Sequence, residues 1–151
     1  MIVETIPMWT DQQTLMPLRD VLTLFQANNW RWKLEDFDGI GRFPDGLTWA
    51  DFQVAVEAGA AIFDWPGIQQ FADGLDQMID GRIVATDAHD AVVVMVDVVD
   101  STEYKIVIDP AWSDAAALAS TVARFASSPV ISAPSTTTVP FLRGPSTPID
   151  L

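Results

Sequence analysis

The sequence predicts an α+β domain, in which three to four helices pack on a mostly antiparallel sheet made of an N-terminal strand and a three-strand meander. Two observations predict this class. Apolar residues recur at helical spacing in four segments, and in four others they alternate with polar residues or run continuously. The last three of these strand-like segments are joined by short polar links, which is typical of antiparallel hairpins.

The first helix is expected to begin near Pro17, because proline is tolerated only in the first turn of a helix. Asn28 and Asn29 would end it. Its apolar stripe is Leu18, Val21, Leu22 and Phe25.

The segment WRWKLE that follows has the two-residue period of a strand with one buried face. Trp30, Trp32 and Leu34 are expected to point into the core, on the side opposite to Arg31, Lys33 and Glu35.

Two further helices are predicted after a run dense in turn formers between Asp38 and Gly46. Thr48 begins a capping pattern for the second helix, which carries Trp49, Phe52 and Val56. After a break at Asp64–Gly67, the third helix is expected to continue to Gly81, a favoured residue type after a helix. Its stripe is Ile68, Phe71, Leu75 and Met78 or Ile79.

The meander is predicted to consist of Arg82–Thr86, Ala91–Val99 and Glu103–Asp109. The middle strand contains the run AVVVMV, which is apolar on both faces, so it is expected at the centre of the sheet or covered on both sides. Ser113 can cap a last helix, whose stripe is Leu118, Val122 and Phe125.

Residues 1–126 are interpreted as one domain, and residues 127–151 as an extension rich in proline, serine and threonine. The apolar residues of this extension, among them Val139 and Phe141, would anchor it as an irregular strap. It either wraps its own domain or is held by a neighbouring chain.

Composition restricts the classes of function. The chain has 21 acidic and 8 basic residues and a formal net charge of -13, which repels nucleic acid and anionic membranes and attracts basic partners. It has no cysteine, which excludes disulfides and thiolate chemistry. Neither a membrane-spanning segment nor a signal peptide is indicated, so a cytoplasmic location is expected.

No nucleotide or cofactor fingerprint is found, and the expected function is therefore an acidic protein-binding module, such as an inhibitor or immunity protein for a basic toxin or nuclease. Opposite charge would speed the encounter with such a partner. The contact surface is expected on the third helix and the meander, at Asp73, Asp76, Asp80, Asp87, Asp90, Asp100 and Glu103.

Two hypotheses from other classes stay open. The first is a structural protein that forms a homo-oligomer by exchanging residues 128–151 between subunits. The second is a hydrolase that uses paired carboxylates, or the single histidine, His89, with a metal held by Asp87 and Asp90. Binding of nucleic acid through Trp30–Lys33 is not expected, because the tryptophans and the cations would lie on opposite faces of the strand.

Overall fold

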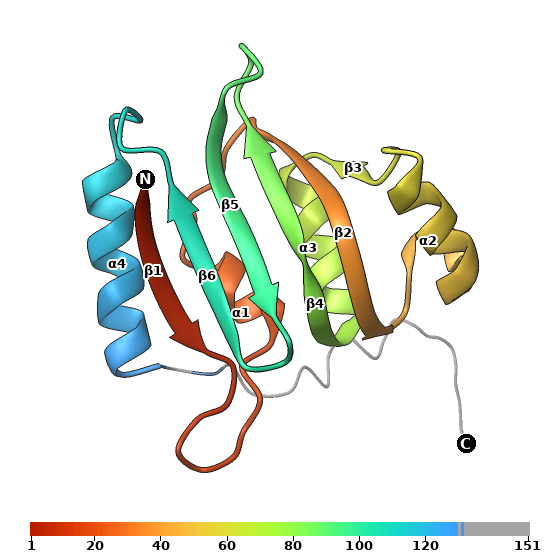
Figure 1. Cartoon of the computed structure of the whole chain (residues 1–151), viewed down its shortest axis with the longest axis horizontal. Helices are drawn as coiled ribbons and strands as arrows, with labels where there is room; N and C mark the ends of the chain where they lie inside the picture. The colour runs from red at the N-terminus through yellow and green to blue at the C-terminus, as the bar shows by residue number, and fades with distance from the viewer. Residues whose placement is uncertain (130, 132–151) are drawn as a thin grey trace, which may run out of the picture.

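The chain folds into one antiparallel sheet with helices behind it and beside its edges (Figure 1). The computed structural model describes residues 1–129 and 131, and within them there are four α-helices and a six-stranded sheet of order β1-β6-β5-β4-β2-β3. The α+β prediction is confirmed. The strands are β1 (Ile2–Pro7), β2 (Arg31–Gly41), β3 (Ile62–Phe63), β4 (Leu75–Thr86), β5 (Val92–Val99) and β6 (Glu103–Ile108). The helices are α1 (Leu18–Leu22), α2 (Trp49–Glu57), α3 (Trp65–Gly74) and α4 (Ala115–Ser127), with a 3-10 turn η1 at Pro44–Gly46.

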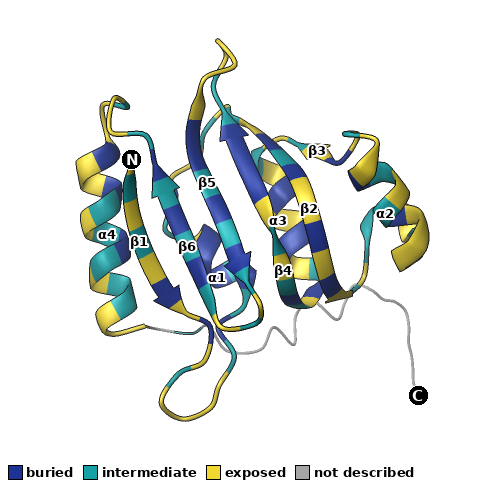
Figure 2. Cartoon of the chain, viewed as in Figure 1, coloured by how far each residue is buried: buried dark blue, intermediate teal, exposed yellow. Residues whose placement is uncertain are grey.

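The helices leave one face of the sheet uncovered. In Figure 1, α1 and α3 lie behind the sheet, α4 lies beside β1 and α2 lies beside β2. No helix of the described residues crosses the front face. Along β5 and β6 the residues that face the helices are buried and those between them are mostly half-buried, as the alternating bands in Figure 2 show. We call the front surface the open face.

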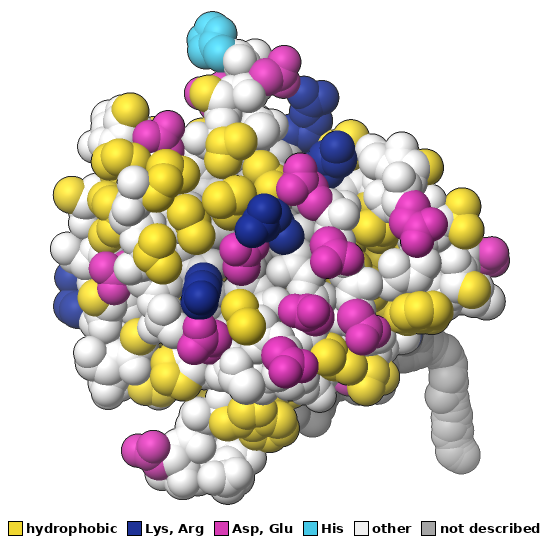
Figure 3. All heavy atoms as spheres, viewed as in Figure 1, with side chains coloured by type: hydrophobic (Ala, Val, Ile, Leu, Met, Phe, Trp, Pro, Cys, Tyr) yellow, Lys and Arg dark blue, Asp and Glu magenta, His cyan; other side chains and the backbone are white. Residues whose placement is uncertain are grey.

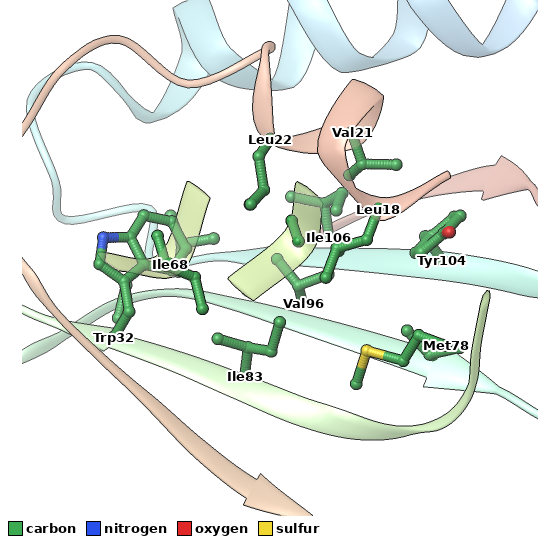
Figure 4. Packing of buried hydrophobic residues seen from close by; sticks show 14 of the residues in the cluster. Leu18, Val21, Leu22, Trp32, Ile68, Met78, Ile83, Val96, Tyr104 and Ile106 are labelled. Carbon is green, nitrogen blue, oxygen red and sulfur yellow. The ribbon is translucent and has the colours of Figure 1, made fainter. Parts of the chain in front are cut away.

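The core lies between the sheet and helices α1 and α3 (Figure 4). Trp32, Ile83 and Ile106 of the sheet and Ile68 of α3 are fully buried there. Burial of each such side chain contributes roughly 1.5–3 kcal/mol. The buried hydroxyl of Tyr104 donates a 2.6 Å hydrogen bond to the carbonyl oxygen of Met16, which ties the segment before α1 to β6.

Strand β1 is absent from the sequence-based interpretation, because the N-terminal strand predicted there is the WRWKLE segment, which is part of β2. Strand β1 pairs with β6 from Ile2↔Ile108 to Pro7↔Glu103, yet of its residues only Ile6 is buried. A six-residue edge strand with one buried side chain has too little hydrophobic periodicity to be recognised alone. Its pairing with β6 and its packing against α4 define it.

The predicted run of turns from Asp38 to Gly46 is wrong in its first half, because β2 continues to Gly41. The glycines there allow strands to approach closely. A Cβ atom at Gly39 would lie 2.8 Å from the carbonyl oxygen of Gln77 in β4, and Gly41 has a φ of +146°. The turn itself is confined to η1 and its neighbours.

The prediction of a helix that continues to Gly81 is also wrong. Helix α3 begins after Asp64, whose side chain accepts a 2.8 Å hydrogen bond from the amide of Gly67, and it ends at Gly74. From Leu75 onward the chain is strand β4, because this segment pairs with β2 at Gly41↔Leu75 and Gly39↔Met78. Spacing of three and four residues between apolar side chains is compatible with both a helix and a bulged strand, and the long-range pairing decides between them.

Other element boundaries differ less. Helix α1 is short, and Phe25 reaches the core from the loop that follows it. Helix α4 has Asp114 rather than Ser113 at its N-cap, with no side-chain capping bond. Most of the expected C-terminal strap lies outside the described residues. No helix in the described part of the chain is long and apolar enough to cross a lipid bilayer.

Gly81→Ala is expected to destabilise the domain by about 3 kcal/mol, because its φ of +144° disfavours any side chain and the added methyl group would overlap the carbonyl oxygen of Asp36. Urea denaturation measures this loss. Gly46→Ala is the matched control: Gly46 also has a positive φ of +69°, but no atom lies within 4 Å of the added carbon. An equal decrease in the free energy of unfolding for both variants would show that the close contact between β2 and β4 at Gly81 does not contribute to stability.

Candidate functional site

The open face is built from three cross-strand rows, which the strand register defines. In an antiparallel sheet, paired residues point to the same face, so each row can be followed from strand to strand. The first row is mostly apolar and consists of Lys33, Val84, Met95, Val107 and Val3. Figure 3 shows hydrophobic side chains gathered over this part of the face.

The second row alternates in charge and consists of Asp36, Arg82, Asp97 and Lys105. Arg82 donates two hydrogen bonds to Asp97, from Nε at 2.7 Å and from an Nη atom at 3.1 Å. These bonds raise the pKa of Arg82 above its usual value, with smaller contributions from the charges of Glu35 and Asp36. Lys105 is in turn 3.8 Å from the carboxylate of Glu103. The cations of this row are therefore neutralised within the protein itself.

The third part of the face is acidic. Asp38 of β2 is paired directly with Asp80 of β4, so two exposed carboxylates lie side by side. An oxygen of Asp80 accepts a hydrogen bond of 3.3 Å from the amide of Asp100, in the turn between β5 and β6. Glu103 follows at the start of β6. We call the acids that lie here and in the charged row, together with Glu35 next to Asp36, the acidic patch, and they are Glu35, Asp36, Asp38, Asp80, Asp97, Asp100 and Glu103.

A shallow hollow of about 400 Å³ lies within the acidic patch, lined by Glu35, Asp36, Asp80, Arg82 and Asp97 among others. Gly81, at the middle of β4, also lines it. Most of its lining residues are charged, and it is open to solvent. It is suited to receive a protruding side chain of a partner rather than to enclose a small substrate.

A bulge in β2 places Asp36 and Asp38 on the open face. The register shifts between Leu34 and Asp36, so Glu35 is an extra residue relative to β4. Leu34 and Phe37 are both buried as a result, although they are three positions apart in the sequence, and Asp36 stays exposed. Simple alternation from Trp32 would have placed Asp36 in the core. The bulge therefore preserves the core and places Asp36 and Asp38 outside.

The structure divides the seven acids expected from the sequence into separate groups. Asp80, Asp100 and Glu103 belong to the acidic patch, and Asp76 is exposed at the start of β4. Asp87 and Asp90 lie in the β4–β5 hairpin, at the other end of β4 from Asp76 and Asp80. Asp90 forms a 2.7 Å ion pair there with Arg31. Asp73 is in α3, behind the sheet.

Four acids of the patch were absent from the expected set: Glu35, Asp36, Asp38 and Asp97. Asp97 had a recognisable signal, since it is the single charged residue in the strand VVVMVDVV. The three acids of β2 had none, because their place beside Asp80 depends on a strand pairing between segments more than forty residues apart in the sequence.

The environment of His89 is that of a hairpin turn. The carboxylate of Asp87 accepts hydrogen bonds from the amides of His89, at 2.8 Å, and Ala91, at 3.0 Å. These bonds lower the pKa of Asp87, with a smaller contribution from the charge of His89. Across the described residues, no group of three or more histidine or carboxylate side chains is arranged to hold a metal ion.

Comparisons with protein-family models, with curated proteins and with solved structures found no match. The function is therefore argued from the geometry of the open face alone.

Asp38→Asn is expected to raise the free energy of unfolding by about 0.5 kcal/mol at low ionic strength, because it removes a like-charge pair directly across two strands. The gain should shrink as salt screens the repulsion. Urea denaturation at two salt concentrations measures it. Asp11→Asn, which removes an exposed charge far from the patch, is the control. An equal gain for Asp11→Asn would assign the effect to net charge and not to the Asp38–Asp80 pair.

Asp73→Asn is expected to stabilise the domain slightly at neutral pH. Burial raises the pKa of the Asp73 carboxyl more than the nearby Arg19 and Arg42 lower it. The folded state therefore binds this proton more tightly than the unfolded state, and ionisation costs stability as pH rises through the two pKa values. Solvent screening limits the gain to less than about 0.5 kcal/mol. The gain should vanish at a pH below both the folded-state and the unfolded-state pKa of Asp73, where the carboxyl is protonated in both states. Urea denaturation at neutral pH and at that low pH measures the difference. An equal gain at both pH values would contradict the prediction.

Proposed function

We propose that this protein is an acidic protein-binding module whose open face docks on a basic partner, such as a toxin or nuclease that it inhibits. The observation that carries the proposal is the gathering of carboxylates from β2, β4, β5 and β6 on a sheet face that no helix of the described residues covers (Figure 3). Arg82 and Lys105 are already paired there with Asp97 and Glu103. The remaining acids are available to a partner's lysines and arginines.

The negative charge of the protein supports rapid association with a basic partner. A surface with a formal net charge of -13 attracts a basic protein from a distance, and a concentrated patch also orients it. Rapid association is what an inhibitor of a harmful partner requires.

The apolar row beside the acids supports a contact of ordinary interface composition. Val3 is 53% exposed, and Met95 and Val107 are half-buried. Protein interfaces typically combine an apolar centre with charged residues at the rim. A partner that covers the whole open face would bury both parts together. The cytoplasmic location expected from the sequence belongs to this proposal as well.

The two other hypotheses, assembly through residues 128–151 and a hydrolase, remain hypotheses from the sequence. Assembly through residues 128–151 concerns a segment that lies mostly outside the described residues. A hydrolase with paired carboxylates would need desolvated acids in a cleft, and the acids of the open face are largely exposed to solvent.

The test is a double charge reversal. A tagged protein captures its partner from native lysate at low ionic strength, and the captured basic protein is then used in association measurements. Asp38→Lys combined with Asp36→Lys is expected to slow association about tenfold or more at low salt, and less at high salt, because both are exposed acids of the patch.

The control is Asp11→Lys combined with Glu57→Lys, which changes the net charge equally at exposed positions away from the patch. Circular dichroism of both double variants verifies the fold. Equal slowing by the two would leave net charge, and not the open face, as the cause and would contradict the proposal.

A further inference from the structure

A second hollow, of about 410 Å³, lies on a different part of the molecule, between the loop that follows α1 and the first half of α4. Its lining residues include three aromatic residues, one acidic residue and small residues of α4. It takes no part in the open face. Pockets of 300–1,000 Å³ are the usual size for small-molecule sites. The residues used below are Phe25, Asn28, Trp30, Trp112, Asp114 and Ala117.

Two tryptophans form a corner in this hollow. The rings of Trp30 and Trp112 have centroids 5.2 Å apart and planes at 79°, an edge-to-face contact in which the two ring planes are nearly perpendicular. Phe25 packs edge-on against Trp30 at 6.5 Å. Both tryptophans are only half-buried, although burial of a large aromatic side chain is strongly favourable. Their remaining surface lines the hollow.

The corner is held in place by hydrogen bonds. The side-chain oxygen of Asn28 accepts from the amide of Trp30 at 3.2 Å and from the indole of Trp32 at 3.0 Å. The amide nitrogen of the same side chain donates to the carbonyl of Gln26 at 2.9 Å. On the other wall, the amide of Trp112 donates to the carbonyl of Asp109 at 3.1 Å. A site fixed in this way requires little reorganisation on binding.

The charge of the hollow favours a cation. Neither lysine nor arginine is among the described residues that line it. Asp114 is exposed and makes no capping hydrogen bond from its side chain, so its carboxylate is free to face a ligand. The amino end of α4 carries about half a positive charge, which the full charge of Asp114 exceeds. Aromatic faces beside a carboxylate are the surroundings in which proteins bind alkylammonium groups.

We propose that this hollow binds a small organic cation, with its alkylammonium group against the faces of Trp30 and Trp112 and its charge balanced by Asp114. The site is independent of the open face, and failure of either proposal leaves the other unchanged.

The test uses choline as the probe and compares it with the neutral isostere in which carbon replaces the quaternary nitrogen. Nuclear magnetic resonance of the full-length protein follows the six tryptophan indole N–H signals. Choline is expected to shift the signals of Trp30 and Trp112 in a saturable way. The isostere is expected to bind about tenfold or more weakly, because it keeps the shape and loses the cation–π attraction. Equal binding of the two, or no saturable shift at millimolar choline, would overturn the proposal.

Variants locate the site. Asp114→Asn keeps the size of the side chain, removes its charge and is expected to weaken choline binding several-fold. Ala117→Leu adds a side chain that fills the hollow and suits a helix, and it is expected to abolish binding. Ala116→Leu, next along the exposed surface of α4 but outside the lining, is the matched control and should bind choline normally. Normal binding by Ala117→Leu would place the choline elsewhere and refute the assignment.

Discussion

The pairing of β2 with β4 is the constraint on which the rest of the structure depends. It is the longest pairing in the described sheet, from Arg31↔Thr86 to Gly41↔Leu75, and it contains three register shifts. Each shift changes which side chains point to the helices. The bulge at Glu35 keeps Phe37 in the core, where its ring contacts Phe43, Phe52 and Phe71. The aromatic cluster that attaches α2 and α3 to the sheet therefore depends on one extra residue.

The same pairing also produces the charged surface. Once α1 and α3 cover one face, the charged residues at the middle of β2 and β4 point to the other, since an unpaired buried charge is far too costly. Asp38, Asp80 and Arg82 accordingly share the open face with Asp97 of β5. The aromatic hollow beside α4 arises differently, from a loop and a helix that are joined by Trp30 and Trp112. The two candidate sites thus use separate layers of one fold.

Local signals in the sequence predicted the elements whose causes are local. Thr48 accepts a 3.1 Å hydrogen bond from the amide of Asp51, as its capping pattern predicts, and α2 follows. The middle strand of the meander begins at Val92, one residue from its predicted start. The two largest failures involve distant partners. Strand β1 is defined by β6, and the change from helix to strand at Leu75 is defined by β2, so neither could be recognised in a short window of sequence.

By itself, the sequence determined the α+β class, the net negative charge, the hairpin links and the absence of cysteine chemistry, because composition and local periodicity are sufficient for these. Only the tertiary structure decided which acids are neighbours. Glu35, Asp36 and Asp38 lie beside Asp80 because two strands distant in sequence pair in one register, and a slip of one residue would exchange their faces. Burial of one face of the sheet selects that register. This burial depends on contacts between segments that are far apart in the chain.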